Sequence, residues 1–191
     1  MSRRARVGLV LATALLALLL AGPAGAAGPW NARIVETGTG TPLEGVVVVA
    51  VYWKMTPGPV HPAQEFHAAD EALSDAEGRV TIPARATTPP HPLARIKGPE
   101  FTFFRAGYGN WNFQGFEQVR DQGLTAREAF SRRVWGQFAG PGVIIEMPPL
   151  RAREERLRHA DHVAPSLLVP KNAVPLLIRA IEREHRELRS R

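Results

Sequence analysis

Residues 41–53 carry the sequence TPLEGVVVVAVYW, and this stretch decides the fold. The run of β-branched residues is too short for an ordinary helix, and valine packs well on the pleated surface of a sheet. Pro42 and Gly45 precede the run and mark a turn, because proline fixes one backbone angle and glycine tolerates unusual ones. The stretch therefore predicts a central, buried strand over residues 45–54.

A second motif, LSDAEGRV at residues 73–80, predicts a β-hairpin. Gly78 suits the left-handed position of the tight turn, and Val80 and Ile82 return toward the core. Hydrophobic alternation and turn signals place the remaining strands. These strands are expected at residues 31–36, 65–73, 79–82, 101–106 and 143–147.

One helix is expected between the last two strands, over residues 124–138. Thr125 and Glu128 have the spacing of a capping box, in which two side chains satisfy free backbone amides of the first turn. Phe130, Val134 and Phe138 recur every four residues and form one apolar face. The chain is therefore expected to be mainly β with a short inserted helix.

The composition indicates one folded domain without covalent cross-links. The 191 residues are 45% hydrophobic, which is enough for a core, and their 17 prolines and 17 glycines suit a protein rich in turns. The chain has no cysteine. Disulfides, thiolate zinc sites and a catalytic thiol are therefore excluded.

The net charge of +6 does not predict nucleic-acid binding, because the positive excess lies at the two ends of the chain. Residues 27–150 hold 11 basic and 12 acidic side chains, whereas residues 151–191 hold 10 basic and 6 acidic ones. A basic patch with interleaved aromatic residues, the usual footprint of a nucleic-acid surface, is missing from the sequence. No nucleic-acid partner is expected.

Residues 1–26 have the order of an export signal. Three arginines lie among the first six residues, residues 7–21 are almost wholly apolar, and the small residues PAGA at 23–26 suit a signal peptidase. The apolar run of about 15 residues is short of the roughly 20 that span a bilayer. We expect cleavage after Ala26 and a periplasmic or extracellular mature protein that meets the membrane only through this signal.

The motifs at residues 41–48 and 75–80, together with RAGY at residues 105–108, resemble those of the carboxypeptidase regulatory-like domain. The resemblance covers residues 32–108. It implies a transthyretin-like Greek-key β-sandwich over residues 27–150, and it implies neither a catalytic residue nor a cofactor. Members of that family occur as accessory modules of exported enzymes, as cell-surface spacers and as independent exported proteins.

Residues 151–191 form a charged extension that is expected to be helical. Asn172 is expected to cap a final helix that ends near Leu188. One face of this helix is too apolar to stay in water, so it must pack on its own sandwich, or else on another protein or a membrane surface, and the acidic residues among its arginines favour a protein contact. The residues of this stripe, which are candidate partner-binding residues, are Val174, Leu177, Ile178 and Ile181.

Aromatic residues are dense between positions 101 and 116, and core packing explains most of them. Trp111 and Phe113 lie in a segment rich in glycine, asparagine and glutamine, and Tyr108 precedes that segment. These three residues are the candidate ligand-binding residues, and a surface glycan is the ligand that aromatic side chains of a loop would suit.

A metal-binding protein or metal-dependent enzyme is an alternative interpretation, in which His61, His67 and His91 meet at one end of the sandwich. Their spacings match no ligand motif, which favours solvated loop side chains. The acidic residues between positions 70 and 77 could hold calcium, but they lack the spacing of a calcium loop. They are interpreted as turn and surface residues.

The sequence as a whole predicts an exported, non-catalytic binding or interaction module of the cell envelope. Neither Ser74 nor Ser131 lies in the strand–turn–helix context of a catalytic serine. No catalytic residue, metal or cofactor is assigned. The expected partner is an envelope protein or a surface glycan, and a carbohydrate-binding module is the second alternative.

Overall fold

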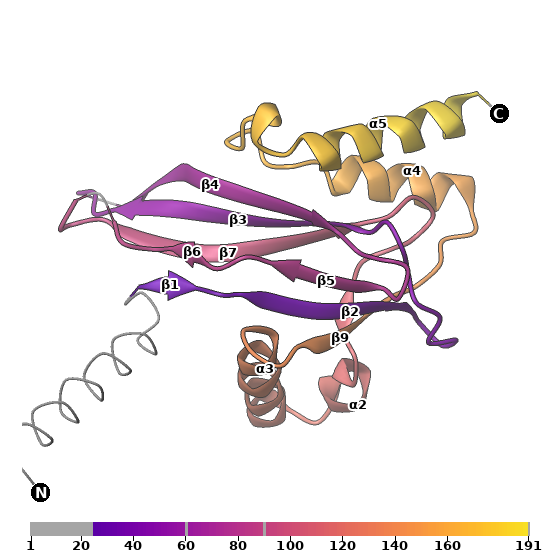
Figure 1. The fold of residues 1–191 in the computed structure, drawn as a ribbon, viewed down its shortest axis with the longest axis horizontal. Helices are drawn as coiled ribbons and strands as arrows, with labels where there is room; N and C mark the ends of the chain where they lie inside the picture. The colour runs from indigo at the N-terminus through magenta and orange to yellow at the C-terminus, as the bar shows by residue number, and fades with distance from the viewer. Residues whose placement is uncertain (1–24, 60, 90, 191) are drawn as a thin grey trace, which may run out of the picture.

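The computed structural model describes residues 25–59, 61–89 and 91–190, and almost all of the expected export signal lies outside these residues. Two β-sheets pack face to face, helices cover the outer face of one sheet, and a further helix lies at one side of the sheets (Figure 1). The prediction of a mainly β fold with an inserted helix and a helical C-terminal segment is confirmed.

A four-stranded sheet forms one half of the core in the order β5, β2, β9, β8. Its strand β2 (Trp30–Glu36) pairs antiparallel with β5 (Arg79–Ile82) and parallel with β9 (Val143–Met147). The short strand β8 (Asn112–Phe113) pairs antiparallel with β9. Segments more than 100 residues apart in the chain therefore lie side by side in this sheet.

A three-stranded antiparallel sheet forms the other half, with β3 (Val47–Thr56) between β4 (Ala63–Leu73) and β7 (Arg95–Phe104). β7 begins earlier than the strand predicted for residues 101–106. In the described part of the chain, no strand pairs with the outer edge of β7. Two short strands, β1 (Ala26–Ala27) and β6 (Arg85–Ala86), pair antiparallel with each other, and the sequence predicted neither of them.

Strand β3 is buried on both of its faces. Val48 and Tyr52 point into the core between the two sheets, where they join Ile34 and Ile145. Residues of the opposite face pack under the C-terminal helices instead. The prediction of a central buried strand is confirmed, and the burial of all residues from 47 to 53 explains why this run lacks the polar alternation of a half-exposed strand.

The inserted helix α3 (Leu124–Phe138) contacts both sheets at one side of the core. The ring centroid of Phe138 lies 4.7 Å from that of Phe101 in β7 and 5.3 Å from that of Trp30 in β2. Its predicted apolar face is confirmed, since Phe130 and Val134 are buried with Phe138. A shorter helix, α2 (Phe116–Arg120), precedes α3 and packs beside it.

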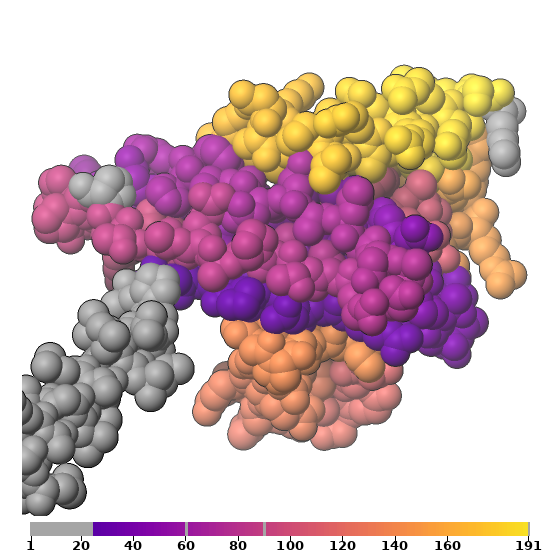
Figure 2. Space-filling model, in the orientation of Figure 1, coloured from indigo at the N-terminus to yellow at the C-terminus, as the bar shows by residue number. Residues whose placement is uncertain are grey.

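The C-terminal segment forms a helical layer that covers the outer face of the three-stranded sheet (Figure 2). This layer consists of α4 (Arg153–His162), the connection 163–174 with the short 3-10 helix η1 (Lys171–Ala173), and α5 (Pro175–Arg189). Within the ranges that the structure describes, no helix has the length and apolarity to cross a membrane.

Both predicted helix caps are wrong. Helix α3 begins after Gly123, so Thr125 lies inside its first turn and no side chain caps the helix. Asn172 lies in η1, and α5 begins only after Val174. The capping group of α5 comes from a distant part of the chain, which local sequence patterns do not reveal.

Both ends of α5 are held by charged side chains from other elements. The carboxylate of Glu71 in β4 accepts hydrogen bonds from the backbone N–H groups of Leu176 and Leu177, each at 2.8 Å. At the other end, the Arg153 guanidinium donates a hydrogen bond of 2.8 Å to the carbonyl oxygen of Leu188. An anion at the N-terminus and a cation at the C-terminus both complement the helix dipole, so these contacts stabilise the helix where it is docked.

A buried ion pair joins α5 to α4. The Glu184 side chain accepts two hydrogen bonds of 2.7 Å from Arg156, and it also accepts one of 3.2 Å from the backbone N–H of Gly107. Glu184 is only 1% exposed. These three donors compensate for the loss of water around the carboxylate, so the pair ties both helices to the end of β7.

The predicted turn between β4 and β5 is confirmed, but the predicted hairpin is wrong, because β4 pairs with β3 in one sheet and β5 pairs with β2 in the other. The Ser74 hydroxyl is buried, accepts a hydrogen bond from the Val46 N–H and donates one to the carbonyl of Leu43. Asp75 accepts hydrogen bonds from its own turn, and the backbone N–H of Arg79 is the main cause that lowers the pKa of this carboxyl. Ser74 and Asp75 are therefore structural residues of the turn.

We expect Gly78→Ala to destabilise the protein more than Gly45→Ala, by about 1–3 kcal/mol. Both glycines have a left-handed backbone, with φ of 74° and 72°, so alanine is strained at either position. A Cβ at Gly78 would in addition collide with the carbonyl oxygen of Ile34, whereas a Cβ at Gly45 meets no atom within 4 Å. Urea unfolding of both variants measures the difference, and an equal loss of stability would contradict the packing at Gly78.

We expect Arg156→Met to lower the free energy of unfolding by about 3–5 kcal/mol, because it leaves the Glu184 carboxylate buried without its cation. Glu184→Leu should cost less, since the freed Arg156 side chain is 24% exposed and can turn toward water. The double variant should be more stable than the sum of the two losses predicts. Glu182→Leu, an exposed change on the same helix, is the control, and an additive double variant would contradict the pairing.

Candidate functional site

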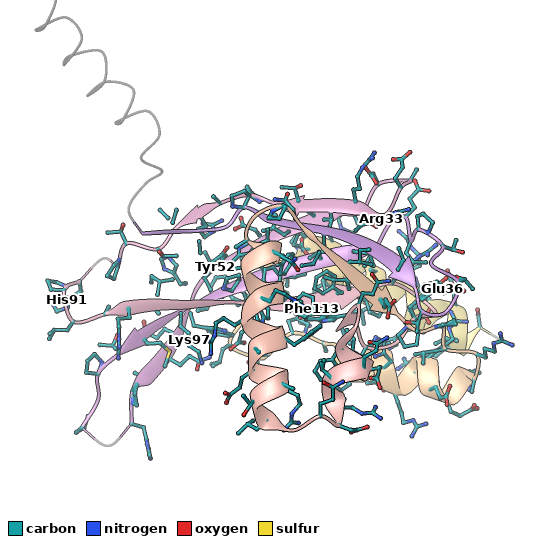
Figure 3. All side chains as sticks on the ribbon, turned by 90° about the horizontal axis from the view of Figure 1, so that it is seen from below. Arg33, Glu36, Tyr52, His91, Lys97 and Phe113 are labelled. Atoms are coloured by element: carbon teal, nitrogen blue, oxygen red, sulfur yellow. The ribbon has the colours of Figure 1, made fainter. Side chains whose placement is uncertain are left out.

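The best candidate for a ligand surface is a groove between α2, β8 and α3, which we call the aromatic groove. Its volume is about 340 Å³. Figure 3 looks toward this side of the molecule, with the labelled Phe113 beside α3. The residues that line the groove are Trp111, Asn112, Phe113, Phe116, Phe130, Ser131 and Trp135.

The aromatic rings of the groove hold one another in position. The ring centroid of Phe113 lies 5.3 Å from that of Trp111 and 5.2 Å from that of Trp135, in both cases edge to face. Trp111 also packs 4.7 Å from Phe103 in the core. Aromatic pairs attract at these separations, and the three groove residues are half-buried rather than enclosed. The groove is therefore a preformed apolar surface that remains accessible.

Two polar side chains complete the groove. Asn112 and Ser131 are exposed, and neither side chain makes a hydrogen bond to the residues that the structure describes. An amide supplies both donors and an acceptor, and a hydroxyl supplies one donor and two acceptor sites. An apolar surface with a few polar groups at its edge is the usual composition of a site for a small ligand.

Tyr108 does not line the aromatic groove. Its hydroxyl donates a hydrogen bond of 3.0 Å to Glu36, and the Arg105 guanidinium lies 4.9 Å from its ring centroid. Burial and the hydrogen bond to Glu36 both raise the pKa of Tyr108. Of the three predicted ligand-binding residues, the structure brings together Trp111 and Phe113 and gives Tyr108 a structural contact instead.

The sequence analysis did not assign Trp135 or Phe130 to the site, although both residues line the groove. Phe130 belongs to the apolar face predicted for α3, and it is counted there as a core residue. Ser131 and Trp135 are four residues apart, so they lie on one face of the helix beside that stripe. This second face is the sequence signal for the part of the site that α3 contributes, and it does not show that α3 approaches β8.

The three histidines of the β region are not brought together. In the described ranges, no three histidine or acidic side chains gather in an arrangement that could hold a metal ion. His91 lies on a loop at one end of the molecule (Figure 3). No observation in the structure favours a metal centre built on His61, His67 and His91.

The acidic residues between positions 70 and 77 have partners within the protein. Asp70 is paired with Arg85, and Glu71 caps α5. Glu77 is within 2.8 Å of Arg79, which also contacts Asp75. Asp70 links two strands, and the other three carboxylates position a turn or a helix, so all four are used within the protein and a calcium site has no support from these contacts.

The apolar stripe of α5 packs against the protein's own sheet. Val174, Leu177 and Ile181 are buried in a cluster with Val49 and other residues of β3. Ile178 is half-buried at the edge of the same cluster. Of the two outcomes that the sequence left open for this helix, the structure shows packing within the chain.

His159 is an unusual residue of the helical layer. Its ring is stacked on Phe104 at 6.1 Å, and its Nε2 atom is buried without a hydrogen-bond partner among the described residues. Burial is the largest cause that lowers the pKa of His159, the neighbouring His162 lowers it further, and Glu184 opposes both. The folded layer therefore favours the neutral imidazole.

Comparison with known proteins does not identify the chain: no protein-family model, curated protein or solved structure matches it. The case for a function therefore depends on the residues and the geometry described above.

We expect the protein to lose stability as the pH falls below about 6.5, in part through His159. The pKa of His159 in the folded state is below its ordinary value of 6.5, so the unfolded chain takes up the proton first. His159→Phe should reduce the loss of unfolding free energy between pH 8 and pH 5, whereas the exposed His162→Gln should change it much less. Urea titrations at several pH values provide the measurement, and parallel profiles for the wild type and His159→Phe would contradict this role.

Proposed function

We propose that the chain is an exported, non-catalytic binding module of the cell envelope and that the aromatic groove is its ligand surface. The observation that carries this proposal is the groove itself, in which half-buried Trp111, Phe113 and Trp135 meet the exposed polar side chains of Asn112 and Ser131. Contacts among the rings and with Phe103 of the core position them, as expected of a preformed site.

Export and family membership belong to the same proposal. The arginines, the apolar run and the small residues of positions 1–26 support a cleaved export signal. The motifs at residues 41–48 and 75–80 support a carboxypeptidase regulatory-like domain with a transthyretin-like Greek-key topology. The structure uses these motif residues for turns and for the core, which is the role that the resemblance implies for them.

A non-catalytic role is supported by the environment of the candidate reactive groups. Ser74 is buried and hydrogen-bonded on both sides, and the acidic residues nearby are paired or cap a helix. Ser131 is the one hydroxyl in the wall of the groove, and no histidine lines the groove beside it. The groove therefore presents groups that bind a ligand without a base that would activate a nucleophile.

A saccharide is the ligand class that this surface fits best. Aromatic rings bind the apolar C–H faces of sugar rings, while amide and hydroxyl groups bind their hydroxyls. The groove supplies both kinds of group within one small space. Helices α2 and α3, which contribute to its walls, lie on the opposite side of the sandwich from the helical layer (Figure 1), and the rings of the groove are partly exposed.

The experiment is a glycan array with the wild type and with Ser131→Trp, followed by calorimetry on the best glycan. Ser131 is exposed on α3, so the added indole should block the groove and weaken binding about tenfold or more without unfolding the protein. Arg132→Trp, at the next exposed position of the same helix, carries the same added side chain outside the groove and should bind like the wild type. The mass of the mature chain, purified from an envelope fraction, checks the cleavage after Ala26.

Two results would contradict the proposal. Equal effects of Ser131→Trp and Arg132→Trp would show that the groove is not the site. If neither glycans nor an envelope extract yields a ligand that Ser131→Trp loses, the binding function of the groove is refuted. A protein captured in place of a glycan would keep the binding module and replace the saccharide.

A further inference from the structure

A cleft lies between α5 and the connection that precedes it, and we call it the helical cleft. Its volume is about 430 Å³. Buried Val169 and Ile181 line the helical cleft. Half-buried Pro165 and Ile178 line it as well. The helical cleft is therefore an apolar hollow in the helical layer, which forms one outer side of the molecule (Figure 2).

Two exposed leucines of the connection lie at the helical cleft. Leu167, which lines the cleft, is fully exposed, and its neighbour Leu168 is 57% exposed. A single exposed leucine is common, but a leucine pair beside an apolar cleft makes a continuous apolar patch, and such patches mark interaction sites. The cluster under the helical layer contains Val169 but neither leucine, so packing within the chain does not explain the pair.

Two opposite charges accompany this apolar patch. Lys171 of η1 precedes α5, whereas Glu182 lies about 10 Å along the helix from its first residue, at the usual rise of about 1.5 Å per residue. Both side chains are exposed and line the helical cleft. Neither forms an ion pair with a residue that the structure describes. The cleft therefore has a basic position before α5 and an acidic position about two turns inside it.

These features are complementary to themselves. Within one chain Leu167 is fully exposed, so it leaves the cleft beside it open. A twofold axis beside the cleft brings the Leu167 side chain of each copy to the cleft of the other. The two α5 helices are then antiparallel, so the same axis brings Lys171 of each copy toward Glu182 of the other. Because the leucine and the cleft belong to one patch, such a contact closes into a dimer and does not extend into a fibre.

We propose that the helical cleft is the interface of a dimer of this chain, in which Leu167 of each copy fills the cleft of the other and Lys171 pairs with Glu182 across the axis. The apolar contact provides the affinity, and the charges fix the antiparallel orientation. Such an interface is small, so the dimer is a reversible one that dissociates at micromolar concentrations.

The dimer does not interfere with the aromatic groove. Helices α2 and α3 lie on the opposite side of the sandwich from the helical layer, so two copies joined through their helical layers keep both aromatic grooves accessible (Figure 1). The proposal does not require the aromatic groove to bind a ligand.

Sedimentation velocity of the purified protein, over concentrations from micromolar to millimolar, tests the apolar contact. Leu167→Glu should weaken the dimer at least tenfold, because the contact would bury a charge. Leu93→Glu makes the same change at an exposed leucine that does not line the helical cleft, and it should dimerise like the wild type. Both variants should keep the wild-type melting curve at low protein concentration, where the chain is monomeric.

Charge reversals test the orientation of the two copies. Lys171→Glu and Glu182→Lys each place like charges opposite each other, so each should weaken the dimer about tenfold. The double variant restores opposite charges and should recover most of the lost affinity. Arg183→Glu, an exposed reversal on the same helix outside the cleft, controls for the change in net charge. High salt should bring the single variants closer to the wild type.

Four outcomes would overturn the proposal. They are a wild type that stays monomeric at millimolar concentration, equal effects of Leu167→Glu and Leu93→Glu, and a double charge variant that is as weak as the two single losses combined. The fourth is a monomer that binds vesicles of phosphatidylglycerol through Leu167, which would make the patch a membrane site. Ser131→Trp should leave the dimer intact, so failure of this interface is distinguishable from failure of the aromatic groove.

Discussion

The structure depends on one constraint, which is that β3 must be kept from water on both faces. Its valines alternate between two environments, and residues 47–53 are buried on both faces and include no charged side chain. The four-stranded sheet covers one face, and the helical layer covers the other. A sandwich of two sheets alone would leave the second face open, so the C-terminal helices belong to the core rather than to an appendage.

The helical layer shows how an apolar contact becomes a specific one. Burial of the α5 stripe favours docking but permits sliding and rotation, since the hydrophobic effect has little directionality. Glu71 and Arg153 contact the start and the end of the helix, and between them Arg156 contacts Glu184 of the helix. These contacts have strict geometry, so they fix one register for a helix that hydrophobicity alone would place only approximately.

Much of the fold could be predicted from local patterns. The valine run predicted β3, the hairpin motif predicted the turn before β5, and the spacing of Phe130, Val134 and Phe138 predicted the buried face of α3. The caps could not be predicted in this way, because Glu71 is more than 100 residues away from the helix that it caps. The candidate site could be predicted only in part, because one of its walls also depends on a contact between distant segments. Trp111 and Phe113 lie in a conspicuous segment, whereas Trp135 joins them only through the packing of α3 on the sheets.

The separation along the chain between β3 and its helical cover has a consequence for the time course of folding. Val49 and Leu177, which share one cluster, are about 130 residues apart in the chain. During synthesis the outer face of the three-stranded sheet therefore has no complete cover until the residues of α5 have emerged. Contacts of such long range form slowly, and an uncovered valine-rich sheet is prone to aggregation. Such a chain gains from a companion, such as a holdase chaperone or a translocation machinery that carries unfolded chains, until its last helix is available.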